Sequence, residues 1–181
     1  MENLFTGLIS SRTRIKLLTR FFFNPATRSY LRELAKEFNV STNSVREELN
    51  QLTKTKLLTS KKSGRQVFYK ANQKHPLFPE LKSMVGKVMG VDQVIDGIVI
   101  RLGDIERAYL LDDYAEGKDT GIVDLLLVGN IDQYHLNDLS RKTERYIKRK
   151  IRTLVLSRDE FKAFEPKLTK SPNILIWEAK K

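Results

Sequence analysis

The sequence contains no cysteine, which excludes disulfide bridges and thiolate metal sites. It also lacks a run of apolar residues long enough to cross a bilayer. In residues 1–14 the acidic residue comes first and the basic residues come last, which is the wrong order for a secretory signal. We therefore expect a cytoplasmic protein that does not associate with membranes.

Positive charge is abundant but unevenly placed. The 181 residues suffice for one large domain or two small ones, and the net charge is +11. Residues 1–75 hold fifteen Lys and Arg against five Asp and Glu, whereas residues 76–181 hold eighteen against seventeen. This asymmetry predicts a polyanion-binding domain over 1–75, followed by a helical connector over 76–90 and a near-neutral domain over 91–181.

Three helical segments are predicted in the basic domain. Ser11, Ser29 and Ser41 each precede a stretch with apolar residues at helical spacing, and each can cap a helix: RTRIKLLTRFFF, YLRELAKEF and TNSVREELNQL. The first stretch ends at an Asn-Pro pair, which stops helices. Only the short turn Asn39-Val40 separates the second stretch from the third. Two short helices joined by a tight turn form a helix-turn-helix.

The third predicted helix has one apolar face and one polar face. Val45, Leu49 and Leu52 share the face expected to pack into the core. The residues on or beside the opposite face are suited to DNA: Thr42, Asn43, Arg46, Glu47, Asn50 and Lys54. Asn bonds adenine bidentately and Arg bonds guanine in the same way. Glu47 can accept from cytosine or orient Arg46, and an ordinary solvated helix face is the alternative for the whole set.

A predicted basic hairpin follows this helix. The extended runs LLTSKK and QVFYKA flank the turn SGR, and Lys61, Lys62 and Arg65 place three cations at its tip. A helix-turn-helix followed by such a hairpin is a winged helix, whose wing contacts phosphates without reading sequence. Double-stranded DNA is the expected partner. RNA binding or a scaffold role remains open, because winged helices also serve these purposes.

Residues 9–75 resemble the winged-helix regulators of the arsenic-repressor type. The matching stretches are SSRTRIKLL, SYLRELAKEFNVSTNSVREELNQL, KLLTSKKSGRQVFYKAN and KHPLF. The resemblance implies a bacterial-type transcriptional regulator that binds palindromic DNA as a homodimer. Some relatives sense metals through cysteines, often with histidines. Metal sensing by that route is excluded here, because the chain has no cysteine and only His75 and His135.

The second half alternates between predicted helices and strands. A helix over VDQVIDGIVIRL precedes the strands ERAYLLD, IVDLLLVG, KIRTLVLS and NILIWE, with a long helix and a short one, DEFKAF, between the later strands. This order predicts a small α/β domain with a mixed sheet. The predicted fold class of the whole chain is therefore α+β, a winged helix-turn-helix followed by that domain.

The span LLDDYAEGKDTGIVDLLLVG resembles the core motif of the minimal nucleotidyltransferases. In that family a Gly-Ser turn holds the nucleotide phosphates, and two aspartates with a third carboxylate hold two magnesium ions. Gly117 matches the family's loop. Asp112 and Asp113, however, replace the Gly-Ser pair, and Ile122 replaces the first aspartate, which leaves Asp124.

The strand expected to carry the third carboxylate has no acidic residue and offers Arg152 instead. We therefore predict no catalytic residue, no metal, no cofactor and no enzymatic activity, although Asp112 or Asp113 could substitute as a metal ligand. The domain would then bind a small molecule or a nucleotide, or mediate dimerisation, and Asp124 would hold the loop. The alternative is an active nucleotidyltransferase that modifies a partner and is targeted by the DNA-binding half.

Overall fold

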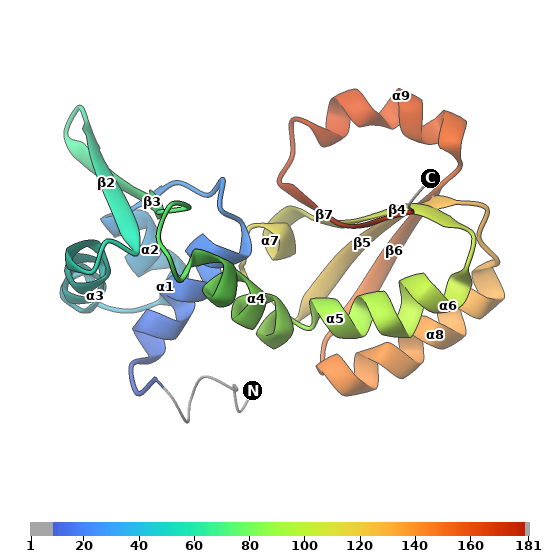
Figure 1. Cartoon of the computed structure of the whole chain (residues 1–181), viewed down its shortest axis with the longest axis horizontal. Helices are drawn as coiled ribbons and strands as arrows, with labels where there is room; N and C mark the ends of the chain where they lie inside the picture. Colours follow the sequence, from blue (N-terminus) through green and yellow to red (C-terminus); the bar gives the residue numbers. More distant parts are fainter. Residues whose placement is uncertain (1–8, 180–181) are drawn as a thin grey trace. The chain divides into compact units, whose positions relative to one another are not determined.

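The computed structural model describes residues 9–179 and divides into two compact units (Figure 1). Unit 1 ends at Val88, and unit 2 begins at Met89. Residues 1–8, on which the interpretation of the N-terminal charge order partly rests, lie outside the described residues. Across residues 9–179 no helix combines the length and the apolar character needed to span a bilayer.

Three helices form the centre of unit 1: α1 (Arg12–Phe23), α2 (Leu31–Phe38) and α3 (Thr42–Lys54). Two of the predicted caps are confirmed. The Ser11 side chain accepts a hydrogen bond from the Arg14 backbone N–H, and the Ser41 side chain accepts one from Ser44.

The predicted cap at Ser29 is wrong. Ser29 and Tyr30 form the short strand β1 (Ser29–Tyr30), which pairs with a strand of the hairpin, and α2 begins at Leu31. Ser29 is completely buried, whereas the backbone N–H of Tyr30 donates to the Glu33 side chain at the start of the helix. Pairing with a distant strand therefore overrides the capping preference of serine at this position.

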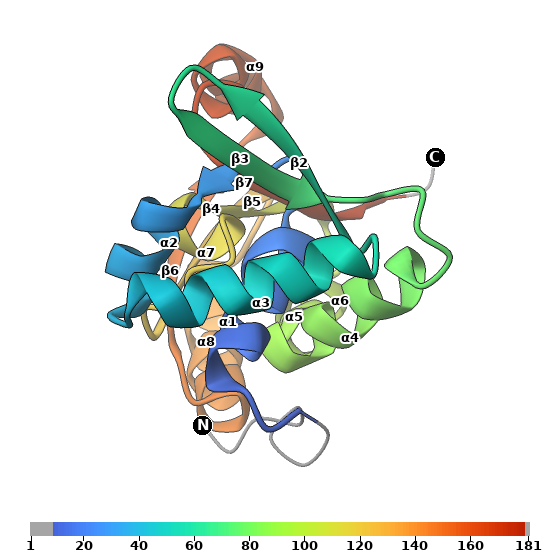
Figure 2. The same cartoon turned by 90° about the vertical axis from the view of Figure 1, so that its left-hand side faces the viewer.

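The hairpin consists of β2 (Leu58–Ser63) and β3 (Gln66–Ala71), and the sheet order is β1-β3-β2. Gly64 has φ of +58°, which suits the first central position of a two-residue hairpin turn. Figure 2 shows the hairpin and α3 on the same side of unit 1. The last helix of this segment, α4 (Phe78–Met89), packs on α1 through Phe78, whose ring centroid lies 5.7 Å from that of Phe22.

Unit 2 is built on a four-stranded mixed sheet. Its strands are β4 (Ile105–Leu111), β5 (Ile122–Gly129), β6 (Lys150–Leu156) and β7 (Asn173–Glu178), in the order β6-β5-β4-β7. β5 and β6 are parallel, whereas β4 is antiparallel to both of its neighbours. The predicted α+β class with a mixed sheet is confirmed.

Helices cover both faces of this sheet (Figure 1). On one face lie α8 (Gln133–Ile147) and a continuous helical stretch made of α5 (Val91–Val94), the π-helical turn η1 (Ile95–Val99) and α6 (Ile100–Leu102). On the other lies α9 (Arg158–Leu168), longer than the short helix predicted there. The aromatic ring of Phe161 on α9 stacks on Tyr109 of β4, 5.7 Å between centroids.

Candidate nucleic-acid interface and nucleotidyl-transfer motif

The polar face of α3 is exposed along its length. Val45, Leu49 and Leu52 are buried in the core, as predicted. The residues predicted to contact DNA from this helix all lie exposed: Thr42, Asn43, Arg46, Asn50 and Lys54. Because the apolar side of α3 is buried in the core, these side chains on its opposite side project into solvent.

Contacts with α1 hold α3 in place. The Nε of Arg14 donates to Glu48 at 2.6 Å, and the hydroxyls of Thr13 and Ser44 lie 3.2 Å apart. Both contacts come from the side of α3 that flanks its buried face. The helix is therefore anchored by residues other than those predicted to contact DNA.

Asn43 and Glu47 are hydrogen-bonded to each other. The Nδ2 of Asn43 donates to Oε1 of Glu47 at 2.9 Å, one helical turn apart. Glu47 was expected either to accept from cytosine or to orient Arg46. In the structure its carboxylate binds Asn43. Asn43 retains its carbonyl oxygen and its second amide hydrogen for a base edge.

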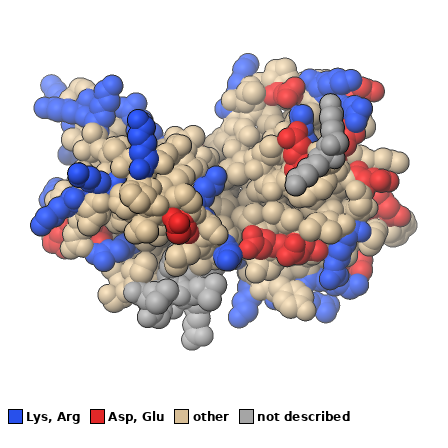
Figure 3. Space-filling model, in the orientation of Figure 1, with Lys and Arg blue, Asp and Glu red and all other residues tan. Residues whose placement is uncertain are grey.

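The cations of the hairpin surround its tip. Lys61 lies opposite Phe68 and Lys62 lies opposite Val67, so the two lysines point to opposite faces of the hairpin. Arg65 occupies the turn, and all three cations are exposed. Lysine and arginine side chains gather over the hairpin and α3 (Figure 3). A phosphate approaching either face of the wing therefore meets positive charge.

Arg28 also belongs to this surface, although no sequence pattern predicts it. Its guanidinium carbon lies 4.1 Å from the centroid of the Phe68 ring, a cation–π contact. Lys61 pairs directly with Phe68 across the hairpin, so Arg28 lies on the same face of the wing as Lys61. The contact depends on the pairing of β1 with β3, which brings residues about 40 positions apart together.

In unit 2 the motif begins with a turn at the end of β4. Asp112 has φ of +51°, a left-handed conformation that glycine adopts without strain. It starts the short helix α7 (Asp112–Ala115), where the sequence predicted a loop. Asp113 is exposed and pairs with Lys118 at 3.3 Å, and Gly117 closes the turn with φ of +79°. The backbone thus has a glycine-like turn here although the side chains are acidic.

Asp124 is paired with Arg152. Asp124 and Arg152 face each other in the parallel register of β5 and β6, and Nε and Nη2 of Arg152 donate to the two carboxylate oxygens at 2.6 and 2.9 Å. The hydrogen bond to Asp124 raises the pKa of Arg152, and the charges of Asp124 and Asp112 act in the same direction. In residues 9–179 no group of three acidic or histidine side chains could hold a metal ion. The cation beside Asp124 belongs to the chain itself.

Two buried residues hold the segment between β4 and β5 in place. Tyr114 is almost completely buried, its hydroxyl donates to the Met89 carbonyl, and burial raises its pKa well above the ordinary value. Arg149, also buried, donates from Nε and Nη2 to both carboxylate oxygens of Asp119 at 2.9 and 2.8 Å. Sequence reasoning missed the Arg149–Asp119 pair, because the two residues lie 30 positions apart without a motif joining them.

Several solved structures are similar to the chain. Reduced HlyU from Vibrio cholerae is 19% identical over 43% of this chain and 74% of its own, with a TM-score of 0.35. A chain from the complex of tri-AMPylated Shewanella oneidensis HEPN toxin with MNT antitoxin is 9% identical over 50% and 71%, with a TM-score of 0.37. A protein from Sulfolobus solfataricus assigned as a nucleotidyltransferase is 16% identical over 52% and 84%, with a TM-score of 0.35. No protein-family model and no curated protein matches the chain.

The prediction that the chain has no enzymatic activity is wrong as it stands. The structures similar to it include the Sulfolobus protein just described and a toxin–antitoxin complex with AMP-PNP, 11% identical over 50% of this chain with a TM-score of 0.40.

Proposed function

We propose that the chain is a sequence-specific DNA-binding protein that regulates transcription, with α3 in the major groove and the β2–β3 hairpin on the phosphate backbone. The observation that carries this proposal is the exposed face of α3, where Asn43, Arg46 and Asn50 point outward beside a hairpin with three exposed cations. Asn43, Arg46 and Asn50 supply hydrogen-bond donors and acceptors for base edges, and the hairpin supplies positive charge for phosphates. The arsenic-repressor type is part of this proposal.

Selection of bound duplexes from a random DNA pool tests it. We expect the full chain to enrich a defined motif, and a palindromic motif with half-sites one helical turn apart if two copies bind together. Failure to enrich any motif, at salt concentrations where the protein is folded, would contradict the proposal. The predicted homodimer is measured separately by analytical ultracentrifugation of the chain with and without the selected duplex.

Nucleotidyl transfer to a partner protein is a second candidate function for unit 2. It is favoured by the glycine-like turn at Asp112 and by the pairing of β4 with β5, in which Leu110 lies opposite Leu125, the neighbour of Asp124. Incubation with radiolabelled ATP or GTP, magnesium and cell extract tests it. Label transfer that is lost in Asp124→Asn but kept in the control Asp159→Asn, an exposed residue of α9, would support the activity.

A further inference from the structure

Unit 2 is nearly neutral in total, but its charges are segregated along the chain. Residues 89–132 contain three Lys and Arg against ten Asp and Glu, whereas residues 133–152 contain seven against two. The second of these segments comprises α8 and the beginning of β6. A strongly basic segment is therefore present outside the winged helix.

The cations of α8 lie on its outer face. At about 100° per residue, one side of this helix carries Tyr134, Asp138, Arg141, Lys142 and Arg145, and Lys148 follows as the C-cap residue. The opposite side packs on the sheet and consists of Leu136, Leu139, Ser140, Thr143 and Ile147, all buried. We call Arg141, Arg145 and Lys148 the α8 basic face, because these three are exposed and follow one another at intervals of four and three residues.

The acidic residues of α8 do not neutralise this face. Asp138 pairs with Lys142 at 2.6 Å, and Glu144 pairs with Lys150 at 2.9 Å and accepts from the backbone N–H of Ile151. Within residues 9–179, no hydrogen bond or ion pair engages the side chains of the α8 basic face. The hydrogen bond from Lys142 lowers the pKa of Asp138, and the charge of Arg141 acts in the same direction without a hydrogen bond or ion pair. Among the described residues, Arg145 and Lys148 thus remain without a partner.

The outer face of α9 shows that this imbalance is not general in unit 2. Arg158 pairs with Glu106 at 2.8 Å, and Lys162 pairs with Asp159 at 2.9 Å. Over the whole of α9, three basic residues are balanced by three acidic ones. A solvated helix face needs no excess of one sign, so the excess on α8 points to a ligand of the opposite sign.

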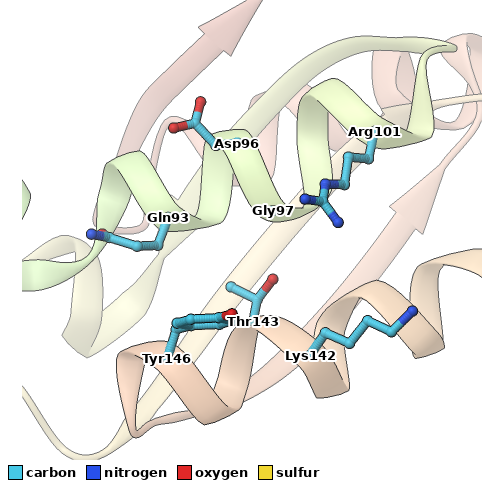
Figure 4. Close-up of a pocket in the computed structure, with 7 residues that line it drawn as sticks. All are labelled: Gln93, Asp96, Gly97, Arg101, Lys142, Thr143 and Tyr146. Atoms are coloured by element: carbon cyan, nitrogen blue, oxygen red, sulfur yellow. The ribbon is translucent and has the colours of Figure 1, made fainter.

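A hollow of about 200 Å³ between η1 and α8 is lined by Arg101 and, from α8, by Lys142 and Tyr146, which are the neighbours in sequence of Arg141 and Arg145. Arg101 points from α6 toward α8, whereas Asp96 points away from it (Figure 4). The ring of Tyr146 lies at the lower border of the hollow and is 82% exposed, and Tyr134, at the other end of α8, is 90% exposed. Tyrosine hydroxyls and arginine side chains are both donors to phosphate oxygens.

We propose that the α8 basic face, with Arg101, binds the phosphate backbone of double-stranded DNA, as a second contact surface in addition to the winged helix. This proposal rests on the DNA-binding function proposed above. Residues 141–147 rise about 9 Å along the helix, which is about three base-pair steps of a strand, and Lys148 follows at the C-cap. The three cations can therefore meet phosphates within one short stretch of a strand, whereas the acidic segment before α8 disfavours an approach of DNA from that part of unit 2.

The salt dependence of DNA affinity tests the proposal in the full chain. The double variant Arg141→Gln/Arg145→Gln is compared with the control Lys167→Gln/Lys170→Gln, which removes the same charge from exposed positions of unit 2. The slope of log K against log salt is expected to become shallower by about 1.8 in the first variant, at about 0.9 for each lost phosphate contact, and to stay unchanged in the control.

Three outcomes would overturn the proposal. An unchanged slope in the α8 variant shows that α8 does not contact DNA. An equal loss in both variants shows an effect of net charge alone. Failure of the wild-type chain to bind any duplex removes the proposed function itself. Failure of the α8 proposal alone is distinguished from that case by Lys61→Gln/Lys62→Gln, because this variant makes the slope shallower than that of the wild type if the winged helix binds DNA.

Discussion

Side chains of the two candidate sites differ in how far they are already engaged by the protein. On α3 and the hairpin, Arg46, Lys61, Lys62 and Arg65 form no ion pair with any residue in the described range 9–179, and all are exposed. In the motif of unit 2, Asp113, Asp119 and Asp124 are each paired with a basic residue. The cations of α3 and the hairpin are therefore available to an anionic ligand. A cation that binds the aspartates of unit 2 must instead compete with basic side chains of the chain. Mutations that separate these two situations give the following predictions.

The largest effect is expected from Asp119→Ala. Arg149 is buried, with 3% of its side chain exposed, and loss of its partner leaves an uncompensated charge in the interior. Removal of one member of a buried pair typically costs about 3–5 kcal/mol of the free energy of unfolding. Urea denaturation measures this loss. The matched control Asp159→Ala, at an exposed position, should change stability by less than about 0.5 kcal/mol, and equal effects would show that the pair is unimportant.

Arg46→Ala should weaken binding to the selected duplex by about 1–3 kcal/mol while leaving binding to random DNA nearly unchanged. The reason is that a bidentate contact with a base edge is lost while the phosphate contacts remain. Electrophoretic mobility shift with both duplexes measures the difference. Equal weakening of specific and random binding would indicate that Arg46 contacts phosphate.

Arg65→Ala is the complement of that variant. Because the hairpin is expected to contact phosphates, affinity should fall alike for specific and random duplexes, and the salt slope should become shallower by about 0.9. Titrations at several salt concentrations measure this. A loss confined to the selected duplex would mean that the wing reads bases.

A smaller effect on stability is expected from Arg152→Ala. Two-thirds of the Arg152 side chain is exposed, and exposed ion pairs contribute little to the free energy of unfolding because water and salt screen them. The variant leaves Asp124 without its guanidinium. Calorimetric titration with magnesium or manganese is then expected to show weak binding that the wild type lacks, if the guanidinium occupies the place of a cation. No gain of binding would show that Arg152 does not mask a metal site.

Much of the fold could be predicted from the sequence where periodicity and caps agree. The amphipathic pattern of α3 and its cap at Ser41 placed the exposed face correctly, and the buried run over β5 placed a central strand. In α1 the pattern predicted one buried stripe, whereas Leu17, Phe21 and Phe23 are buried as well. This helix is enclosed on more than one side, which a single sequence period does not reveal.

Features that depend on pairing between distant segments could not be predicted. β1 is too short to show an alternating pattern, and its pairing with β3 is what puts Arg28 on the wing. The sequence did suggest Arg152 in place of a third carboxylate, but its bond to Asp124 follows from the parallel register of β5 and β6. The charge segregation in unit 2 was hidden because the acidic excess of residues 89–132 offsets the basic excess of residues 133–152 in the total.

The left-handed turn at Asp112 has a consequence for how this motif can change. An aspartate holds there the backbone shape that a glycine would take freely, and its N–H remains bonded to the Pro172 carbonyl. The scaffold and the chemistry of the motif are therefore separable. Replacement of Asp112 by glycine would remove the carboxylate and leave both the φ of +51° and the bond to Pro172 in place, so the charge at this turn can change while its backbone stays the same.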